Sequence, residues 1–303
     1  MISNSTIPVF PDSVPLALEH REIVEKALEK RQPVVSEHNF TEIFMWKDSR
    51  ALTLSMLDNC LIISGKAPDM HFMHLPLGNE GVPSAIKKAL GYFRDKGIKC
   101  GLYALVPEEF EKFGVDSPEF IREPLRDQFD YVYLREDLAR LEGRKYDGKR
   151  NLIKKFKEAN SFSFEKISSA NIEECIVFQE HWCKVRNCPD DLSLNEESTG
   201  VMEVLKNFNS LSCIGGALRI DGAIQGITVA SRLNENTVLV HIEKANASYK
   251  GIYQVINNVF VNEMPGEFVF INREQDVGVE GLRKAKLSYY PHHMVEKHMV
   301  SLK

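Results

Sequence analysis

The first half of the chain contains short apolar or alternating runs separated by polar breaks. Four such runs lie at residues 40–46, 51–57, 60–65 and 71–78. Runs of this length with polar residues between them are typical of strands in an antiparallel meander. The pattern therefore predicts that this part of the chain forms a sheet.

A helical pattern follows these predicted strands. Between residues 83 and 97, apolar side chains stand at Ile86, Ala89, Leu90 and Phe93. This spacing places all four on one face of a helix. We therefore expect a helix that covers the sheet.

The rest of the first half leads into a charged connector. We expect a strand at 100–106, a short acidic helix at 107–113 and another strand at 129–134. The residues that follow, 135–158, carry no wide apolar stripe in their first half. We therefore place a domain boundary near residue 145.

The second half follows a more regular order. The predicted elements are strands at 161–167, 212–220, 223–233, 237–243, 268–271 and 292–302, and helices at about 170–186, 195–208, 249–264 and 279–290. Asp221 and Gly222 separate two of the strands and form the strongest two-residue hairpin signal. The predicted order is β, α, α, β, β, β, α, β, α, β.

Length and composition agree with two globular domains. A chain of 303 residues is long enough for about two domains, which we expect at residues 1–145 and 146–303. Apolar content of 43% and charged content of 27% are ordinary for a globular protein. The net charge of −5 gives no global basic field, so any nucleic acid must meet a local basic face.

The cysteines give no metal-binding pattern. None of the six forms a CxxC, and Cys183 and Cys188 lack the second pair that a zinc site needs. His71 and His74 fall on opposite faces of their predicted strand, which also argues against a metal site. We expect reduced, buried thiols and no bound metal.

The sequence predicts a cytoplasmic protein. Its first 15 residues lack the basic start and the apolar core of a signal peptide. No run approaches the roughly 20 apolar residues of a transmembrane helix. We therefore expect at most a peripheral contact with a membrane.

The densest polar cluster follows the apolar strand at 268–271. It consists of Asn272, Arg273, Glu274, Gln275 and Asp276. Arg273 has the fork geometry that binds phosphate or carboxylate, and Glu274 or Asp276 could accept a proton. The structural alternatives are an ion pair between Arg273 and Glu274 and a helix N-cap formed by Asp276.

A lysine on the last predicted helix is a further candidate for chemistry. On the predicted helix 279–290, Lys286 lies about 40° from Leu282, within the apolar face formed with Ala285 and Tyr289. Such a lysine either extends along apolar surface or reaches an anion.

His241 and Glu243 point to one side of their strand, where they could act as a base and its orienting partner. The alternative is a structural histidine.

Three long motifs resemble a known family. Residues 130–151, 241–257 and 272–291 are similar to the family of the phosphatidylglycerol lysyltransferase C-terminal domain. The order of elements resembles the GNAT acyltransferase fold, and two such units in one chain resemble the Fem-type aminoacyl transferases. The resemblance implies an α+β fold of two tandem GNAT-like units, each a mixed, mostly antiparallel sheet flanked by helices.

The resemblance also implies a function. We expect an acyltransferase that moves an aminoacyl group from aminoacyl-tRNA to a lipid or other small nucleophilic acceptor, with no permanently bound cofactor. An acyl-CoA-dependent N-acyltransferase and a non-catalytic GNAT-fold binding protein are the alternatives. The usual coenzyme A loop, Q/R-x-x-G-x-G/A, is not matched at residues 248–253, where Tyr253 replaces a small residue.

In GNAT-type units the donor enters a gap between two splayed strands, here 237–243 and 268–271. The helix after the first of these strands would present its N-terminus to phosphate, with Lys250 and Gly251 at its start. The candidate catalytic residues are Glu274, Asp276 and His241. The candidate substrate-binding residues are Glu243, Lys244, Lys250, Gly251, Tyr253, Gln254, Asn272, Arg273, Gly278, Lys286 and Tyr289.

One dense basic run lies on the connector. Its members are Lys149, Arg150, Lys154, Lys155 and Lys157. They could bind the phosphates of tRNA in a salt-dependent manner. The alternative is a solvated helix face.

Overall fold

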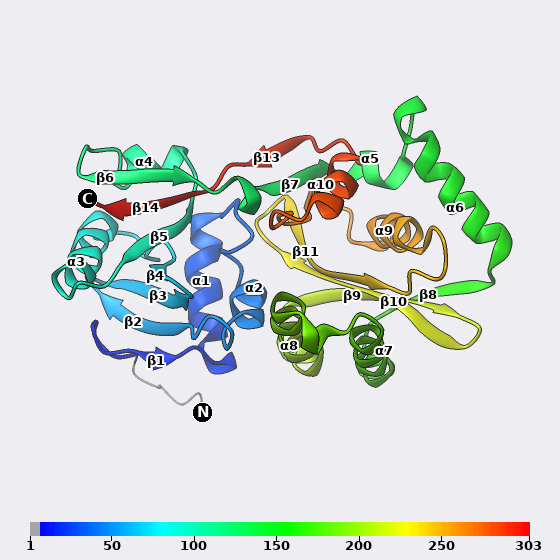
Figure 1. The fold of residues 1–303 in the computed structure, drawn as a ribbon, viewed down its shortest axis with the longest axis horizontal. Helices are drawn as coiled ribbons and strands as arrows, with labels where there is room; N and C mark the ends of the chain where they lie inside the picture. Colours follow the sequence, from blue (N-terminus) through cyan, green and yellow to red (C-terminus); the bar gives the residue numbers. More distant parts are fainter. Residues whose placement is uncertain (1–6) are drawn as a thin grey trace. The chain divides into compact units, whose positions relative to one another are not determined.

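The structure of the chain is a computed structural model that describes residues 7–303 (Figure 1). The chain divides into two compact units. The first consists of the chain up to Phe129 together with Val295–Lys303, and the second is Asp130–Met294.

The first unit contains a seven-stranded sheet in the described residues, in the order β1-β2-β3-β4-β5-β14-β6. Its elements are β1 (Val14–Pro15), η1 (Leu18–His20), α1 (Arg21–Arg31), α2 (Phe40–Met45), β2 (Thr53–Leu57), β3 (Cys60–Ala67), β4 (Met70–Met73), α3 (Val82–Asp95), β5 (Cys100–Leu105), α4 (Glu108–Lys112), β6 (Phe120–Pro124), η2 (Arg126–Gln128) and β14 (His298–Leu302). The predicted helix at 83–97 is α3, and its apolar face packs into the core of this unit.

The segment 40–46 forms a helix, so the predicted strand is wrong there. All six residues of α2 are buried, and the Asn39 side chain caps the helix by accepting hydrogen bonds from the amides of Thr41 (2.9 Å) and Glu42 (3.3 Å). A buried helix has no polar face, so its sequence has no helical period. The N-cap was the only local signal of the helix.

The second unit contains a seven-stranded sheet in the order β13-β7-β12-β11-β10-β9-β8. Its elements are β7 (Asp130–Leu134), α5 (Arg135–Arg140), η3 (Arg144–Tyr146), α6 (Asp147–Ala159), β8 (Phe162–Lys166), α7 (Ile172–Val185), η4 (Cys188–Asp190), α8 (Leu192–Lys206), η5 (Phe208–Ser210), β9 (Cys213–Ile220), β10 (Ala223–Arg232), β11 (Thr237–Ala245), α9 (Ile252–Glu263), β12 (Phe270–Asn272), α10 (Glu280–Leu287) and β13 (His293–Val295). The predicted order is confirmed from β8 to α10, but the last predicted strand, 292–302, is two strands, β13 in this sheet and β14 in the sheet of the first unit.

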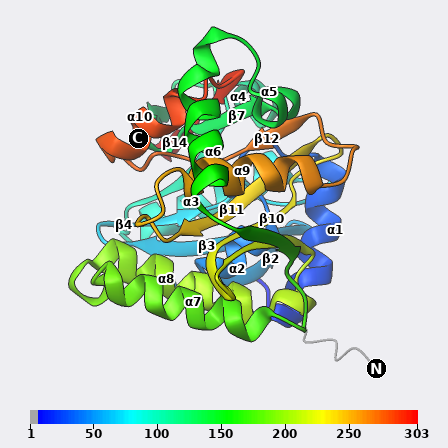
Figure 2. The ribbon, with the colours of Figure 1, turned by 90° about the vertical axis from the view of Figure 1, so that its right-hand side faces the viewer.

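Helices cover both faces of this sheet. α7 packs against β10 and β11 from one side, and α9 packs against the same strands from the other (Figures 1 and 2). Asp221 and Gly222 have φ angles of 49° and 81°, and β9 and β10 pair on either side of them. The predicted hairpin is therefore confirmed.

The two units divide the chain differently from the boundary expected near residue 145. β7 precedes that boundary but pairs with β12 of the second unit. β14 follows it but lies between β5 and β6 of the first unit. Long-range strand pairing therefore decides the division, and the local hydrophobic pattern carries no information about it.

The expected connector contains a regular helix. Within α6, Ile153 and Phe156 are buried in the core of the second unit, where they pack with residues of α9.

Across the described residues, no helix is both long and apolar enough to cross a membrane.

Candidate active site in the second unit

A fork between two parallel strands is the central feature of the site. β11 and β12 pair only at Thr237–Phe270, Val238–Ile271 and Leu239–Asn272. Beyond these pairs the strands separate, as the resemblance implies. Polar side chains from both strands meet in the mouth of this fork.

A β-bulge positions the first of them. Val229 pairs with Ile242 and Ala230 with Val240, so His241 is the extra residue on β11. Bulges change the direction of a side chain and occur often beside active sites. His241 Nε2 lies 2.8 Å from Ser231 Oγ, and Nδ1 lies 3.5 Å from Glu274 Oε1.

The structure therefore brings the predicted residues His241 and Glu274 together across the fork. It also adds Ser231 from β10, which sequence reasoning missed. Nothing in the sequence marks Ser231, because only the strand register places it beside His241. Of the three, Glu274 has the most accessible side chain, at 19%.

A second charged pair crosses the same mouth. Arg273 Nη2 donates to Glu243 Oε1 at 2.8 Å, and Asn257 of α9 donates to Glu243 Oε2 at 3.1 Å. The ion pair of Arg273 is thus with Glu243, not with its neighbour Glu274 as we considered. Burial acts to lower the pKa of Arg273, but the carboxylate of Glu243 raises it overall.

Asp276 is fully buried and accepts several hydrogen bonds. Its carboxylate accepts hydrogen bonds from the Tyr131 hydroxyl (2.6 Å), the Gly278 amide (2.9 Å) and two nitrogens of Arg283 (both 2.8 Å). Burial raises its pKa, but these donors outweigh burial and hold the pKa well below its usual range. A carboxylate held in this way is a poor proton acceptor, so Asp276 fixes the loop before α10.

Asp276 is also not the N-cap of that helix. The N-cap is Val279, and Asp276 forms a turn with Gly278, whose φ is 78°. Asn272 shapes the start of the same segment. It donates to Asp130 at 3.0 Å and accepts from the Glu274 amide at 2.8 Å.

Lys286 binds the backbone of residues 273–275. Its ammonium donates to the carbonyls of Arg273 and Gln275, each at 2.5 Å, and burial lowers its pKa to about 8. Leu282, expected on the same inward face, is 39% exposed, so the predicted apolar face is wrong there. Lys286 lies inward because it binds backbone carbonyls, and no apolar stripe accompanies it.

The start of α9 differs from the expected phosphate loop. Gly251 has a φ of 94°, and a Cβ there would lie 2.8 Å from the carbonyl oxygen of Leu152 on α6. The glycine therefore permits close packing of α9 against α6. Lys250 is exposed, and Tyr253 donates to the carbonyl of Ala245 at 3.0 Å.

Tyr289 links α9 to the fork. Its ring lies 5.1 Å from the Arg273 guanidinium, and the Gln254 side chain acts to lower the pKa of its hydroxyl. Burial raises the pKa of Tyr289 to about 12, so it is a neutral phenol.

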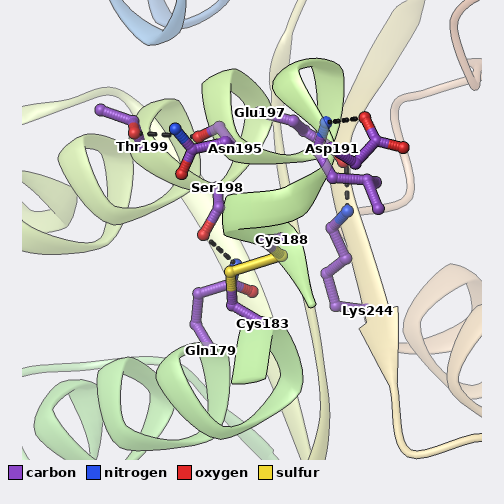
Figure 3. Close-up of a disulfide and its surroundings, with 10 residues drawn as sticks. Gln179, Cys183, Cys188, Asp191, Asn195, Glu197, Ser198, Thr199 and Lys244 are labelled. Atoms are coloured by element: carbon purple, nitrogen blue, oxygen red, sulfur yellow. Dashed lines mark hydrogen bonds and ion pairs between the residues drawn. A yellow bond between two sulfur atoms is a disulfide. The ribbon is translucent and has the colours of Figure 1, made fainter. Parts of the chain in front are cut away.

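Lys244 lies on the opposite face of β11. Its ammonium is 2.6 Å from Glu197 of α8 (Figure 3). It also lies 4.2 Å from the centre of the Trp182 ring of α7. Side chains alternate along a strand, so Lys244 points away from Glu243. The structure therefore places Lys244 outside the fork.

A disulfide lies in the helical layer that the Lys244 side chain faces. It joins Cys183 at the end of α7 to Cys188 in η4 (Figure 3). The expectation of reduced thiols is therefore wrong for this pair. Three other cysteines, Cys60, Cys100 and Cys175, are buried free thiols, as expected.

The basic run of α6 lines a groove. The groove has a volume of about 390 Å³, and its lining includes Arg140, Arg150, Lys154 and Lys157. Arg150 also binds the carbonyls of Leu141 and Gly143 and the carboxylate of Asp147, while Lys154 lies 3.8 Å from Glu158. Lys155 is exposed, and Lys149 turns away toward Ser288.

Comparisons with known proteins identify the family of the chain. The model of the family described as phosphatidylglycerol lysyltransferase, C-terminal, matches residues 29–301. A conserved protein of unknown function from Bacteroides thetaiotaomicron is 31% identical, with a TM-score of 0.89 over 96% of this chain and 99% of that one. No curated protein matches the chain.

Two more distant structures share the fold. The C-terminal domain of a putative lysylphosphatidylglycerol synthetase from Agrobacterium fabrum is 13% identical, with a TM-score of 0.66 over 92% of this chain and 91% of that one. L-PGS from Bacillus licheniformis is 16% identical, with a TM-score of 0.64 over 99% and 94% of the two chains. The chain belongs to the phosphatidylglycerol lysyltransferase C-terminal family, with the predicted α+β fold of two tandem GNAT-like units.

Proposed function

We propose that this protein transfers an aminoacyl group from a charged tRNA to a small nucleophilic acceptor, such as a lipid headgroup. The family supplies the reaction class. The observation that carries the proposal is the fork between β11 and β12, where His241 and Glu274 face each other at 3.5 Å. A carboxylate beside an imidazole can accept a proton from an acceptor group.

The transfer is one direct displacement. The acceptor oxygen or nitrogen attacks the carbonyl carbon of the aminoacyl ester, and the bond from that carbon to the ribose oxygen breaks. The proton of the acceptor passes to Glu274, which then donates it to the departing ribose oxygen. Glu274 is the partly exposed member of the pair, and the fully buried imidazole of His241 orients it.

The remaining residues position the reactants. Arg273 supplies a fixed positive charge at the fork, and charge placed in advance stabilises an oxyanion that forms during transfer. Lys286, Asp276 and Asn272 hold the backbone of residues 272–278 in place. A donor and an acceptor held in a fixed orientation react far faster than free molecules.

The basic groove of α6 supports tRNA as the donor. Lys154 and Lys157 line it, and Lys155 lies exposed on the same helix. Cations on one helix face bind a phosphate backbone through release of counterions. This contact would weaken steeply with added salt.

A transfer assay tests the proposal. Labelled, fully charged host tRNA is incubated with the protein and with lipid, peptide and small-molecule fractions of a cell extract. Acetyl-CoA with labelled acetyl is run in parallel. We expect label to move from tRNA into one fraction, which identifies the acceptor class.

The other outcomes are equally informative. Label that moves only from acetyl-CoA would replace the proposal with acyl-CoA-dependent transfer. Retention of charged tRNA on a filter without product would indicate a binding protein. Either result would contradict aminoacyl transfer.

A further inference from the structure

Two cations from distant parts of the sequence lie against one aromatic ring. Lys149 Nζ of α6 is 4.0 Å from the centre of the Tyr289 ring, and the Arg273 guanidinium is 5.1 Å from it. The sequence assigned Lys149 to a basic helix face, together with Lys154 and Lys155. The structure instead turns Lys149 inward, toward the fork.

The hydrogen bonds of this cation pair are incomplete. Arg273 uses Nη2 to bind Glu243, whereas its Nη1 is buried and has no acceptor among residues 7–303. Lys149 binds the neutral hydroxyl of Ser288 at 2.6 Å, and that hydroxyl donates to the Ala285 carbonyl. An arginine nitrogen buried without an acceptor is costly, so a ligand that supplies one is favoured.

The charges are also unbalanced. Glu243 is the carboxylate in contact with Arg273, and the described residues place no carboxylate in contact with Lys149. The nearby Lys286 interacts electrostatically with Glu274 and Asp130 and, more weakly, with Glu243. The pair of Arg273 and Lys149 thus has two positive charges and one negative charge.

The electrostatics of Lys149 agree with a missing anion. Burial lowers its pKa, and the positive charge of Arg273 lowers it further. A bound anion between the two cations would reverse the second effect. Lys149 and Ser288 are both half-buried, so solvent reaches the Lys149 end of the pair.

We propose that Arg273 and Lys149 form a binding site for a phosphodiester beside Tyr289. A phosphodiester carries the single negative charge that the pair lacks, and its oxygens match the donors of a guanidinium. This inference rests on the proposed function for the identity of the ligand. Both substrates of that reaction contain a phosphodiester, the donor at the 3′ end of tRNA and the acceptor in a phospholipid headgroup.

Calorimetric titration of the full chain with two probes tests the site and identifies the source. One probe is the ribonucleotide CCA, which represents the tRNA end, and the other is glycerophosphoglycerol, which represents the headgroup. Lys149→Met removes the charge and keeps the length of the side chain. We expect it to weaken binding of one or both probes about tenfold or more.

Two further variants make the test specific. Lys206→Met removes an exposed lysine from α8 of the same unit, to which no binding role is assigned, and should leave both affinities unchanged. Arg273→Lys keeps the positive charge but removes the planar guanidinium. It should weaken binding of the same probe as Lys149→Met. Melting curves of each variant separate lost binding from lost folding.

The outcomes separate this site from the proposed reaction. A probe that binds the native chain and is lost in Lys149→Met supports the site, even if no aminoacyl transfer is found. No binding of either probe, or equal binding by Lys149→Met and the native chain, would overturn it. A matching loss in Lys206→Met would also overturn it, since removal of any positive charge would then weaken binding.

Discussion

At the scale of single residues, the contacts of each polar side chain decide its role. Glu274 and Asp276 are two residues apart and equally acidic, yet only Glu274 has an exposed edge, while Asp276 accepts hydrogen bonds from three residues. The sequence shows both carboxylates and cannot rank them, because Tyr131 lies 145 residues away from Asp276. The sequence therefore predicted which polar residues lie at the site, but not the hydrogen-bond partner of each.

Asp276 should contribute to stability in a pH-dependent way. Asp276→Asn leaves the Arg283 charge without its partner and should cost about 2–4 kcal/mol of unfolding free energy near pH 7. The pKa of Asp276 is lower in the folded chain than in the unfolded one. Its contribution is therefore complete above about pH 4 and is lost as pH falls toward the folded pKa.

Urea unfolding of both proteins at several pH values measures this effect. The difference between native and variant chains should shrink progressively below about pH 4. A difference that stays constant into acid would show that the carboxylate is not the stabilising form.

At the scale of elements, helices and strands with a one-sided pattern were predictable. α3, α9 and the β9–β10 hairpin follow from period, cap and turn residues. α2 was not, because it is buried on all sides and lacks a period. The fork itself was expected from resemblance alone, since no local signal states where two parallel strands stop pairing.

Gly251 should be essential for packing α9 against α6. Gly251→Ala places a Cβ 2.8 Å from the Leu152 carbonyl at a φ of 94°, and should cost about 1–3 kcal/mol. Gly281→Ala is the matched control, because nothing lies within 4 Å of its Cβ position. It should leave stability unchanged or raise it by up to about 1 kcal/mol.

Thermal melting compares these two variants directly. Equal melting temperatures would mean that the close approach of α6 does not constrain the start of α9. In that case the glycine would be free to serve a ligand instead.

At the scale of the whole molecule, each unit depends on strands that are distant in sequence. β14 completes the sheet of the first unit, and β7 joins the sheet of the second. The charge pattern places the expected boundary in the connector, whereas strand pairing places it at residues 129 and 130. Local patterns cannot predict such pairings. The sequence of a strand indicates which of its own side chains are buried, but not which strand it pairs with.

Lys297 should anchor the C-terminal segment to the first unit. Its side chain is fully buried and donates to Glu37 at 2.6 Å and to Ser36 at 3.0 Å. Lys297→Ala leaves Glu37 buried without this charge and should cost about 3–5 kcal/mol. Lys303→Ala, at an exposed lysine, should cost almost nothing, and chemical denaturation of the two variants provides the comparison.

In the proposed reaction, the fork between β11 and β12 carries out aminoacyl transfer with Glu274 as the proton acceptor. The most direct test is the single-turnover rate of transfer from charged tRNA by the native chain, by Glu274→Gln and by the exposed control Glu280→Gln. We expect Glu274→Gln to be slower by about 10²–10⁴-fold with unchanged tRNA affinity, and Glu280→Gln to match the native chain. Transfer by Glu274→Gln at the native rate would show that Glu274 is not the proton acceptor.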